Sequence, residues 1–198
     1  MLRNHRLVLM AGIAIVAVTA CDKKTDATAD STSAMMNDSA MTTSTMTPAP
    51  LTDANIVYIL DEASNADSAR GAVAATKGTS GDVRDFGKLM AGEHHSLRQM
   101  GQELATKLGV APMPPANDMS VAEAQTQMDK LNAEAKGTMW DKAYIDYEVT
   151  YHRAVIETAT KALDAASNQE LKDLIAKAAP ILQKHLDRAL EIQSKLPM

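Results

Sequence analysis

The sequence predicts an all-α protein whose main domain is a long four-helix bundle, with a short extra helix between the second and third long helices. Four stretches of about 25 to 29 residues repeat apolar side chains every three or four positions, as a helix with one buried face requires. Glycine and proline separate these stretches. Only one Phe and one Trp occur in 198 residues, so the core must be built from Ala, Leu, Ile, Val and Met.

Residues 1–20 have the pattern of a secretory signal peptide. Arg3 and Arg6 form a basic start, residues 7–18 are almost wholly apolar, and small residues follow directly before Cys21. The apolar run is shorter than the roughly 20 residues that a transmembrane helix needs. We therefore expect residues 1–20 to direct export and then to be removed.

Cys21 is the only cysteine, so no disulfide can form within the chain. A lone cysteine at the cleavage point resembles the lipobox of bacterial lipoproteins, in which the thiol is acylated and becomes the new N-terminus. The alternative is an ordinary signal peptide with an incidental cysteine. Lipidation predicts a protein on the periplasmic side of the cell envelope, anchored through Cys21 to the inner or the outer membrane.

Residues 21–50 are predicted to be the lipidated cysteine followed by a flexible tether. The segment is rich in Thr, Ser, Ala, Asp and Met and shows no apolar periodicity, so it can bury too little surface to fold. Removal of residues 1–20 lowers Lys plus Arg from 20 to 18 against 25 Asp plus Glu, a net charge of −7. With no polybasic patch, we expect the membrane as a partner through the lipid and no nucleic acid.

Residues 51–198 are predicted to form the bundle domain, and its first two helices have clear ends. Thr52 or Asp53 can cap a helix that runs to about Lys77. Residues 78–81 form a Gly-containing break. The next helix is expected from about Asp82 to Leu108, where Gly109 stops it.

The later elements follow from the same signals. Ser120 with Glu123 is a capping-box pattern for a short helix that runs to about Lys136. A long helix is expected from about Thr138 to Ala166. Ser167 or Asn168 can cap the last helix, which reaches about Leu196 and contains Pro180. Helices of this length extend for about 40 Å at 1.5 Å per residue.

Each long helix carries ionisable residues on its apolar stripe. These are Asp67 in the first helix, His94 in the second, Glu148 and His152 in the third, and His185 in the fourth. Counted from the turns, Asp67 and His94 differ in height by about 5 Å, as do His152 and His185, and all four levels fall near the middle of the bundle. A rival stripe through Trp140, Tyr144, Tyr147 and Tyr151 would turn His152 sideways.

Buried ionisable groups must be paired, hydrogen-bonded or metal-bound. Imidazoles and carboxylates at the centre of a bundle suit zinc, iron, copper or manganese. The candidate ligands are His94, His152, His185, Asp67, Glu93 and Glu148. The alternative, on even terms from the residues alone, is a structural polar core in which the histidines bond to Tyr or Asp. His95, rotated by about 100° from His94, is expected at the surface.

Three motifs resemble a known family. Asp85-Phe86 through Met90 to Glu93-His94, Trp140 to Tyr144 followed by His152, and Leu171-Lys172 through Pro180 to His185-Leu186 are similar to the bacterial "domain of unknown function 4142" family of the ferritin-like superfamily. The similarity covers about residues 53–195. It implies an often exported, ferritin-like four-helix bundle with no established activity, and it matches the family histidines to His94, His152 and His185.

The chain departs from the ferritin-like di-iron pattern, which uses Glu-x-x-His pairs on two helices. Glu148 is four residues before His152, and Ala91 is three before His94. This departure argues against a di-iron oxidase centre. We therefore expect a cell-envelope lipoprotein that binds a transition metal in its core. The alternative is a non-catalytic structural or stress-related interaction module. No nucleophile motif or Gly-rich phosphate loop indicates an enzyme.

Overall fold

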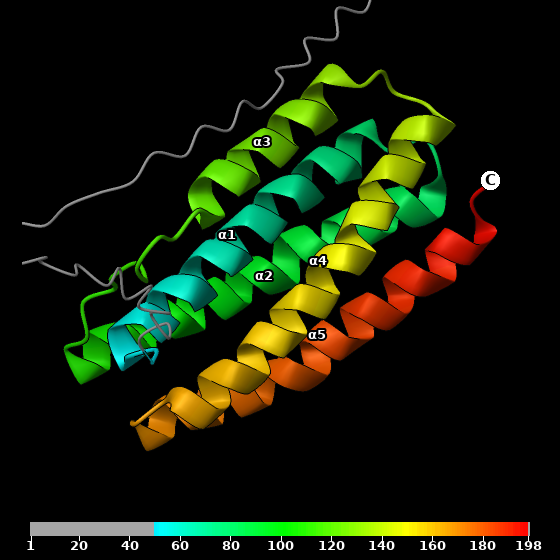
Figure 1. Cartoon of the computed structure of the whole chain (residues 1–198). Coiled ribbons are helices and arrows are strands. Elements are labelled where there is room, and N and C mark those ends of the chain that lie inside the picture. Colours follow the sequence, from blue (N-terminus) through cyan, green and yellow to red (C-terminus); the bar gives the residue numbers. More distant parts are fainter. Residues whose placement is uncertain (1–49, 198) are drawn as a thin grey trace, which may run out of the picture. The chain divides into compact units, whose positions relative to one another are not determined.

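The computed structural model describes residues 50–197, which contain five α-helices and no strand (Figure 1). The helices are α1 (Asp53–Lys77), α2 (Gly81–Leu108), α3 (Ser120–Ala133), α4 (Thr138–Ala165) and α5 (Gln169–Lys195). The all-helical prediction is confirmed, and the bounds of the four long helices agree with the expected ones to about one residue. The proposed signal peptide, Cys21 and most of the tether lie outside the described residues.

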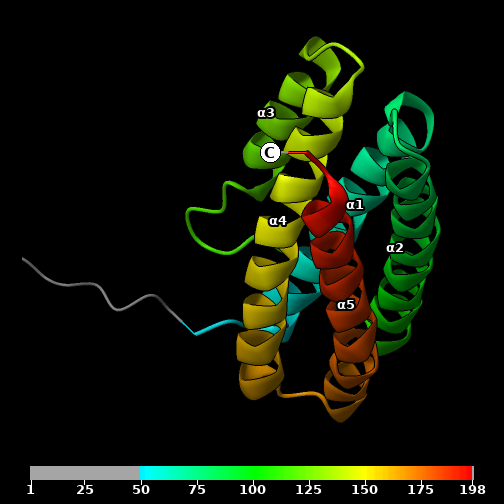
Figure 2. The ribbon, with the colours of Figure 1, turned by 90° about the vertical axis from the view of Figure 1, so that its right-hand side faces the viewer.

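The long helices pack as two pairs in a bundle-like arrangement. α1 lies along α2 and α4 lies along α5, each pair joined by a three-residue connection (Figure 2). α2 also packs against α5, whereas α3 lies against α1 and α4. α1 and α4 contact each other at few positions, so that side of the interior is the least closed.

Two glycines bring α1 and α2 unusually close. A Cβ atom on Gly71 would lie 2.7 Å from the carbonyl oxygen of Gly87, and one on Gly87 would lie 2.5 Å from the amide nitrogen of Ala75. Because these contacts are with backbone, no side-chain movement would relieve them. The first pair is therefore held together backbone against backbone.

Local hydrogen bonds explain where the helices begin and end. The Thr52 hydroxyl accepts from the Asn55 amide while the Asn55 side chain accepts from the Thr52 amide, which is a capping box. Gly109 ends α2 in the left-handed conformation, at φ 65°. The Asn168 side chain accepts from the amides of Glu170 and Leu171 at the start of α5.

The short helix α3 differs from the prediction at both ends. Its N-cap is Met119, without a side-chain cap, because the Ser120 hydroxyl instead donates to Asp118 Oδ2 at 2.9 Å. The expected capping box of Ser120 with Glu123 is therefore absent. The helix ends at Ala133, three residues before the predicted Lys136, because Glu134 is already extended.

The core has two chemically distinct halves. The half near the α1–α2 turn, here called the aromatic half, is built around Phe86, Trp140 and Tyr144, together with Val83, Met90, Leu131, Ile145, Ala189 and Ile192. The opposite end, here called the alanine half, is built from smaller side chains, namely Ile56, Val57, Ala105, Ala159, Ala162, Ala166, Leu171, Ile175 and Leu182.

No helix within residues 50–197 is both long enough and apolar enough to cross a membrane.

Candidate functional site

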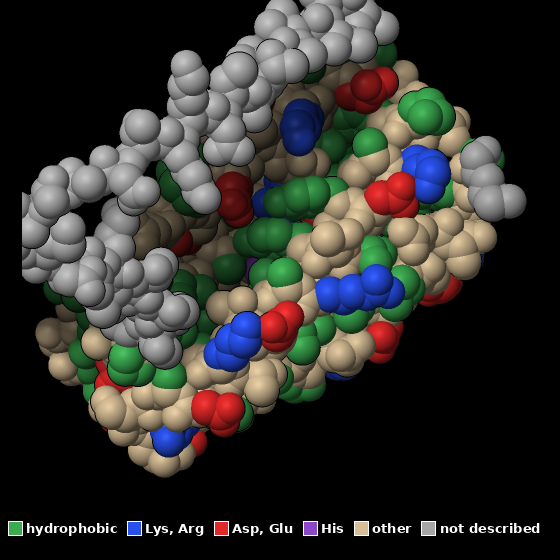
Figure 3. Space-filling model, viewed as in Figure 1, with side chains coloured by type: hydrophobic (Ala, Val, Ile, Leu, Met, Phe, Trp, Pro, Cys, Tyr) green, Lys and Arg blue, Asp and Glu red, His purple; other side chains and the backbone are tan. Residues whose placement is uncertain are grey.

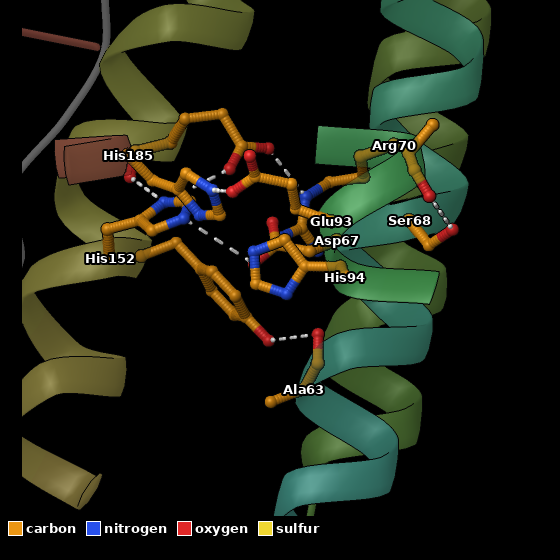
Figure 4. A network of polar contacts seen from close by, with 11 residues as sticks. Ala63, Asp67, Ser68, Arg70, Glu93, His94, His152 and His185 are labelled. Atoms are coloured by element: carbon orange, nitrogen blue, oxygen red, sulfur yellow. Dashed lines mark hydrogen bonds and ion pairs between the residues drawn. The ribbon is translucent and has the colours of Figure 1, made fainter. Parts of the chain in front are cut away.

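A layer of buried ionisable side chains lies between the two halves of the core. Figure 4 shows the polar contacts within this layer. The layer is formed by Asp67 and Arg70 from α1, His94 from α2, Glu148 and His152 from α4, and His185 from α5. Each of these side chains is 2% exposed or less. The structure thus brings together, at one depth, the stripe residues that the sequence places on four helices.

The three imidazole rings form a triangle. The ring centroids of His94 lie 5.7 Å from those of His152 and 5.0 Å from those of His185, and the latter two lie 5.4 Å apart. One ring nitrogen from each histidine lies within 4.8 Å of the other two. Three nitrogens from three different helices therefore converge on one point.

Hydrogen bonds orient two of these rings and leave a nitrogen on each ring unused. His152 Nδ1 lies 2.9 Å from the carbonyl oxygen of Glu148, so it acts as the donor there. His185 Nε2 lies 2.7 Å from Glu93 Oε2. His152 Nε2, His185 Nδ1 and both nitrogens of His94 make no hydrogen bond. A carbonyl or carboxylate on the far nitrogen is the usual way to orient a metal-ligating imidazole.

The two oxygens of Asp67 have different surroundings, and so do those of Glu148. Arg70 donates from Nε to Glu148 Oε1 at 2.9 Å and from Nη2 to Asp67 Oδ1 at 2.5 Å. The second oxygens, Asp67 Oδ2 and Glu148 Oε2, have no hydrogen-bond partner. Asp67 Oδ2 lies 3.2 Å from His94 Nε2 and 3.8 Å from His152 Nε2. One oxygen of each carboxylate thus binds Arg70, and the other is free toward the histidines.

Aromatic rings complete the surroundings of Arg70. Its guanidinium carbon lies 4.2 Å from the ring centroid of Tyr151 and 4.9 Å from that of Tyr147. Such cation–π contacts stabilise a desolvated cation. The Tyr151 hydroxyl donates to the carbonyl oxygen of Ala63 at 3.4 Å, which holds the ring in place.

Burial keeps the imidazoles neutral. It lowers the pKa of His94 to about 2, and the neighbouring His185 and His152 lower it further. Burial also lowers the pKa of His152 and of His185, although the hydrogen bond that His185 donates to Glu93 opposes the change at His185. A neutral imidazole keeps a lone pair on one ring nitrogen, and this neutral form is the one that binds a metal.

The carboxylates respond in the opposite direction. Burial, followed by the charge of Asp67, raises the pKa of Glu148 to about 7 even though Arg70 favours its ionised form. Burial raises the pKa of Asp67 as well, again against the attraction of Arg70. Because burial is the largest cause in both, a further cation would favour the ionised carboxylates strongly.

The last candidate ligand, Glu93, lies outside the layer, as do His95 and Asp141. Glu93 is 46% exposed and contacts His185 from the outside of the layer. His95 is exposed, as expected from its position one residue after His94. Asp141, which also lies on the α4 stripe, accepts hydrogen bonds from the amides of Thr79 and Ser80 at 2.8 Å and 2.6 Å. It therefore fixes the α1–α2 turn rather than joining the site.

The two rival stripes of α4 turn out to be compatible. Trp140 and Tyr144 are buried, yet Glu148 and His152 are buried too, because α4 packs on α5 with one face and toward α1 and α3 with the other. Tyr147 and Tyr151 are half-buried. His152 is therefore not turned sideways.

Sequence reasoning missed the role of Arg70 as the counter-ion of two carboxylates. The available signal was the spacing of Asp67 and Arg70, three residues apart on one helix face. Glu148 lies 78 positions beyond Arg70 in the chain, so that ion pair depends on tertiary packing.

Two overlapping sets of donors lie close enough together to hold a metal ion. One is His94, His152 and His185, and the other is Asp67, Glu148 and His152. Nitrogen donors with one or two carboxylate oxygens suit zinc, iron, copper and manganese. The unbonded nitrogens and oxygens named above belong to these two sets, so the donors fit such an ion.

Comparison with known proteins identifies the family of the chain. No curated protein and no solved structure shows significant similarity to the chain. A family model described as "Domain of unknown function (DUF4142)" matches residues 37–192, which includes all the residues of the buried layer. Because the match covers most of the chain, the protein belongs to the DUF4142 family.

Proposed function

We propose that this protein binds one transition-metal ion through His94, His152 and His185, with Asp67 or Glu148 completing the coordination sphere. The observation that supports the proposal is the convergence of three buried imidazoles, each with an unbonded ring nitrogen, within 4.8 Å. The three residues come from three helices, so the fold rather than local sequence holds them together.

The energetics of burial favour a ligand at this point. A buried polar group without a hydrogen bond destabilises a protein by about 1–3 kcal/mol. Four unbonded nitrogens and two unbonded carboxylate oxygens lie in one layer here. A metal ion bound by several of them would remove much of that unfavourable term at once.

Arg70 supports a single ion rather than two. A dinuclear centre uses carboxylates that bridge two metals. Here one oxygen of Asp67 and one of Glu148 are already bound by the guanidinium. A second divalent cation at that position would meet a fixed positive charge at close range. The proposal is therefore a mononuclear site within a ferritin-like arrangement of helices, and not a di-iron oxidase.

The test is metal binding by protein purified without a histidine tag. Chelator-treated protein is melted alone and with an excess of Zn²⁺, Cu²⁺, Fe²⁺ or Mn²⁺. At free metal near 100 times Kd the folded state gains about 2.7 kcal/mol, which raises Tm by several degrees. Elemental analysis should find one ion per chain.

Matched variants separate the site from adventitious binding. His152→Ala should lose the metal-dependent rise in Tm, whereas His95→Ala, which changes an exposed histidine, should keep it. If none of the four metals raises Tm, or if the triple variant His94→Ala, His152→Ala, His185→Ala binds as tightly as wild type, the proposal is wrong.

A second candidate function is a non-catalytic envelope interaction module with a metal-free polar core. The observation that favours it is the pairing of Arg70 with Asp67 and Glu148, which neutralises buried charge without a metal. In that case the histidine variants lose only packing and hydrogen bonds, and chelator leaves Tm unchanged.

We further propose that the protein is an exported lipoprotein, attached to a membrane of the cell envelope through Cys21. The support is the basic start, the short apolar run and the small residues before that cysteine. Cys21→Ser should abolish labelling by a fatty-acid analogue and release the mature protein from membranes. A variant that stays membrane-bound after a high-salt wash would contradict the anchor.

A further inference from the structure

An elongated groove opens between α1 and α4, beneath α3, and its floor is α5. Its volume is about 370 Å³, within the range of small-molecule sites. Its lining extends along α4 from Tyr147 to Ala162, which corresponds to about 22 Å at 1.5 Å per residue. In Figure 3 the surface is hollowed on this side, and hydrophobic side chains line the hollow.

The groove leads inward to the buried layer. A smaller cavity of about 40 Å³ adjoins it, and His94 is among the residues that line this cavity. The two cavities share six lining residues, Leu60, Ala63, Val155, Ile175, Ala178 and Leu182. The His94 side chain is 2% exposed and neither of its ring nitrogens makes a hydrogen bond. An unpartnered polar group therefore lies at the inner end of an apolar passage.

The walls favour an apolar chain. Alanines on four helices leave the space open, and five further lining residues are Ile, Leu or Val. Several of these, among them Ile59, Leu60 and Val155, are only half-buried. An apolar ligand that covered these side chains would remove them from water, and the burial of apolar surface would favour its binding.

The lining residues of the groove are acidic where they are charged. Glu62, Asp118 and Glu123 belong to the lining, and no Lys or Arg does. All three carboxylates come from the side of the groove formed by α1, α3 and the segment that precedes α3. A cationic group would be attracted there, and an anionic one repelled.

We propose that the groove binds an elongated amphiphile with a positively charged head. The apolar chain lies along α4 toward His94, and the head lies among Glu62, Asp118 and Glu123. The walls and the charged residues of the groove are not among the proposed metal ligands, and only the smaller cavity is lined by one of them, His94.

The experiment uses the mature protein in chelator and follows displacement of the fluorescent probe N-phenyl-1-naphthylamine. Dodecyltrimethylammonium and dodecyl sulfate are compared below their micellar concentrations at one ionic strength. The cation should displace the probe at a concentration at least about tenfold lower than the anion. Equal displacement by both would overturn the assignment of a cationic head.

Variants locate the site. Ala63→Phe fills the passage and should weaken binding of the cation by at least about tenfold. Ala143→Phe adds the same ring at an exposed position of α4 outside the lining and should bind as wild type. If Ala63→Phe lowers helicity, Ala66→Phe, which changes a half-buried lining residue, replaces it. Unchanged binding in the filled variant would overturn the site.

Removal of charge tests the head group separately. The double variant Glu62→Gln, Glu123→Gln should lose most of the preference for the cation while it still binds the apolar probe. A preference that persists in this variant would contradict the role of these carboxylates. Because every measurement is made in chelator, its outcome is distinct from that of the metal-binding test.

Discussion

The aromatic half and the alanine half of the core differ in the size of the side chains that fill the space between the helices. In the aromatic half, Trp140 and Tyr144 stack with ring centroids 5.5 Å apart, and the Trp140 indole donates to the carbonyl oxygen of Leu131 at 2.7 Å. In the alanine half the side chains are smaller and α1 and α4 stay apart, which leaves the groove. Large side chains fill the aromatic half, whereas the alanine half stays partly open.

The ionisable layer lies at the boundary between these two halves. Trp140, Tyr144 and Phe86 pack on one side of it, and the small cavity that His94 lines lies on the other side. The packed side shields the layer from water, and the other side leaves space next to His94. The following predictions break or sharpen this comparison, beginning with the largest effect.

Truncation should be more damaging in the aromatic half. Trp140→Ala should destabilise the protein by about 3–5 kcal/mol, because the side chain is fully buried and its indole hydrogen bond is lost. Ile175→Ala, beside the groove, should lose only about 2 kcal/mol, since the space adjoins an existing passage. Urea unfolding measures both, and equal losses would contradict the distinction.

Removal of Arg70, the counter-ion of Asp67 and Glu148, should destabilise the layer between the two halves. Arg70→Met leaves Asp67 and Glu148 buried without a positive partner and should destabilise the metal-free protein by about 3–5 kcal/mol. Arg70→Lys keeps the charge but loses the forked geometry, so its loss should be smaller. A loss in Arg70→Met below about 1 kcal/mol would show that the carboxylates are neutral in the folded state.

Acid should destabilise the metal-free protein. The histidines have pKa values below the ordinary 6.5, so the unfolded chain binds more protons as the pH falls below that value. Glu148 opposes this, because its pKa of about 7 lies above the ordinary 4.5 and the folded protein takes up that proton first. The three histidines lower the free energy of unfolding as the pH falls, and Glu148 and Asp67 raise it. The net loss is about 1–3 kcal/mol per pH unit.

Unfolding free energies from pH 8 to 5 in chelator measure this slope. His95→Ala, which changes an exposed residue, should leave the slope unchanged, and His94→Ala should reduce it. Stability that increases toward pH 5 would mean that the histidines pair with carboxylates as imidazolium ions.

Added volume gives the smallest contrast. Ala74→Leu, at a fully buried position of the aromatic half, should destabilise by about 1–3 kcal/mol through overpacking. Ala66→Leu extends into the groove and should change stability by no more than about 0.5 kcal/mol. Thermal melts of the pair test whether the open space tolerates larger side chains.

The helices and the buried layer were predictable because both depend on local periodicity. Thr52, Gly109 and Asn168 act as the caps and stops that their types indicate. The metal role of His94, His152, His185, Asp67, Glu93 and Glu148 remains a proposal, although five of the six meet in one layer and Glu93 contacts it through His185.

Features that depend on tertiary packing were not predictable. One local contact was missed as well: the Ser120 hydroxyl donates to Asp118, and the expected capping box is absent. The pairing of Arg70 with Glu148 and the capture of the α1–α2 turn by Asp141 join residues more than 60 positions apart. The groove results from the low contact between α1 and α4, and no single stripe encodes that spacing.

The glycine contact between α1 and α2 has a consequence for the order of folding. These helices are joined by a short turn and meet backbone to backbone at Gly71 and Gly87, so their contacts are local and should form early. Asp67, Arg70 and His94 belong to this hairpin, whereas Glu148, His152 and His185 belong to the α4–α5 hairpin. The histidine triangle therefore exists only after the hairpins dock. A bound metal should slow amide hydrogen exchange most for those openings that separate the two hairpins, and least for the fraying of either hairpin alone.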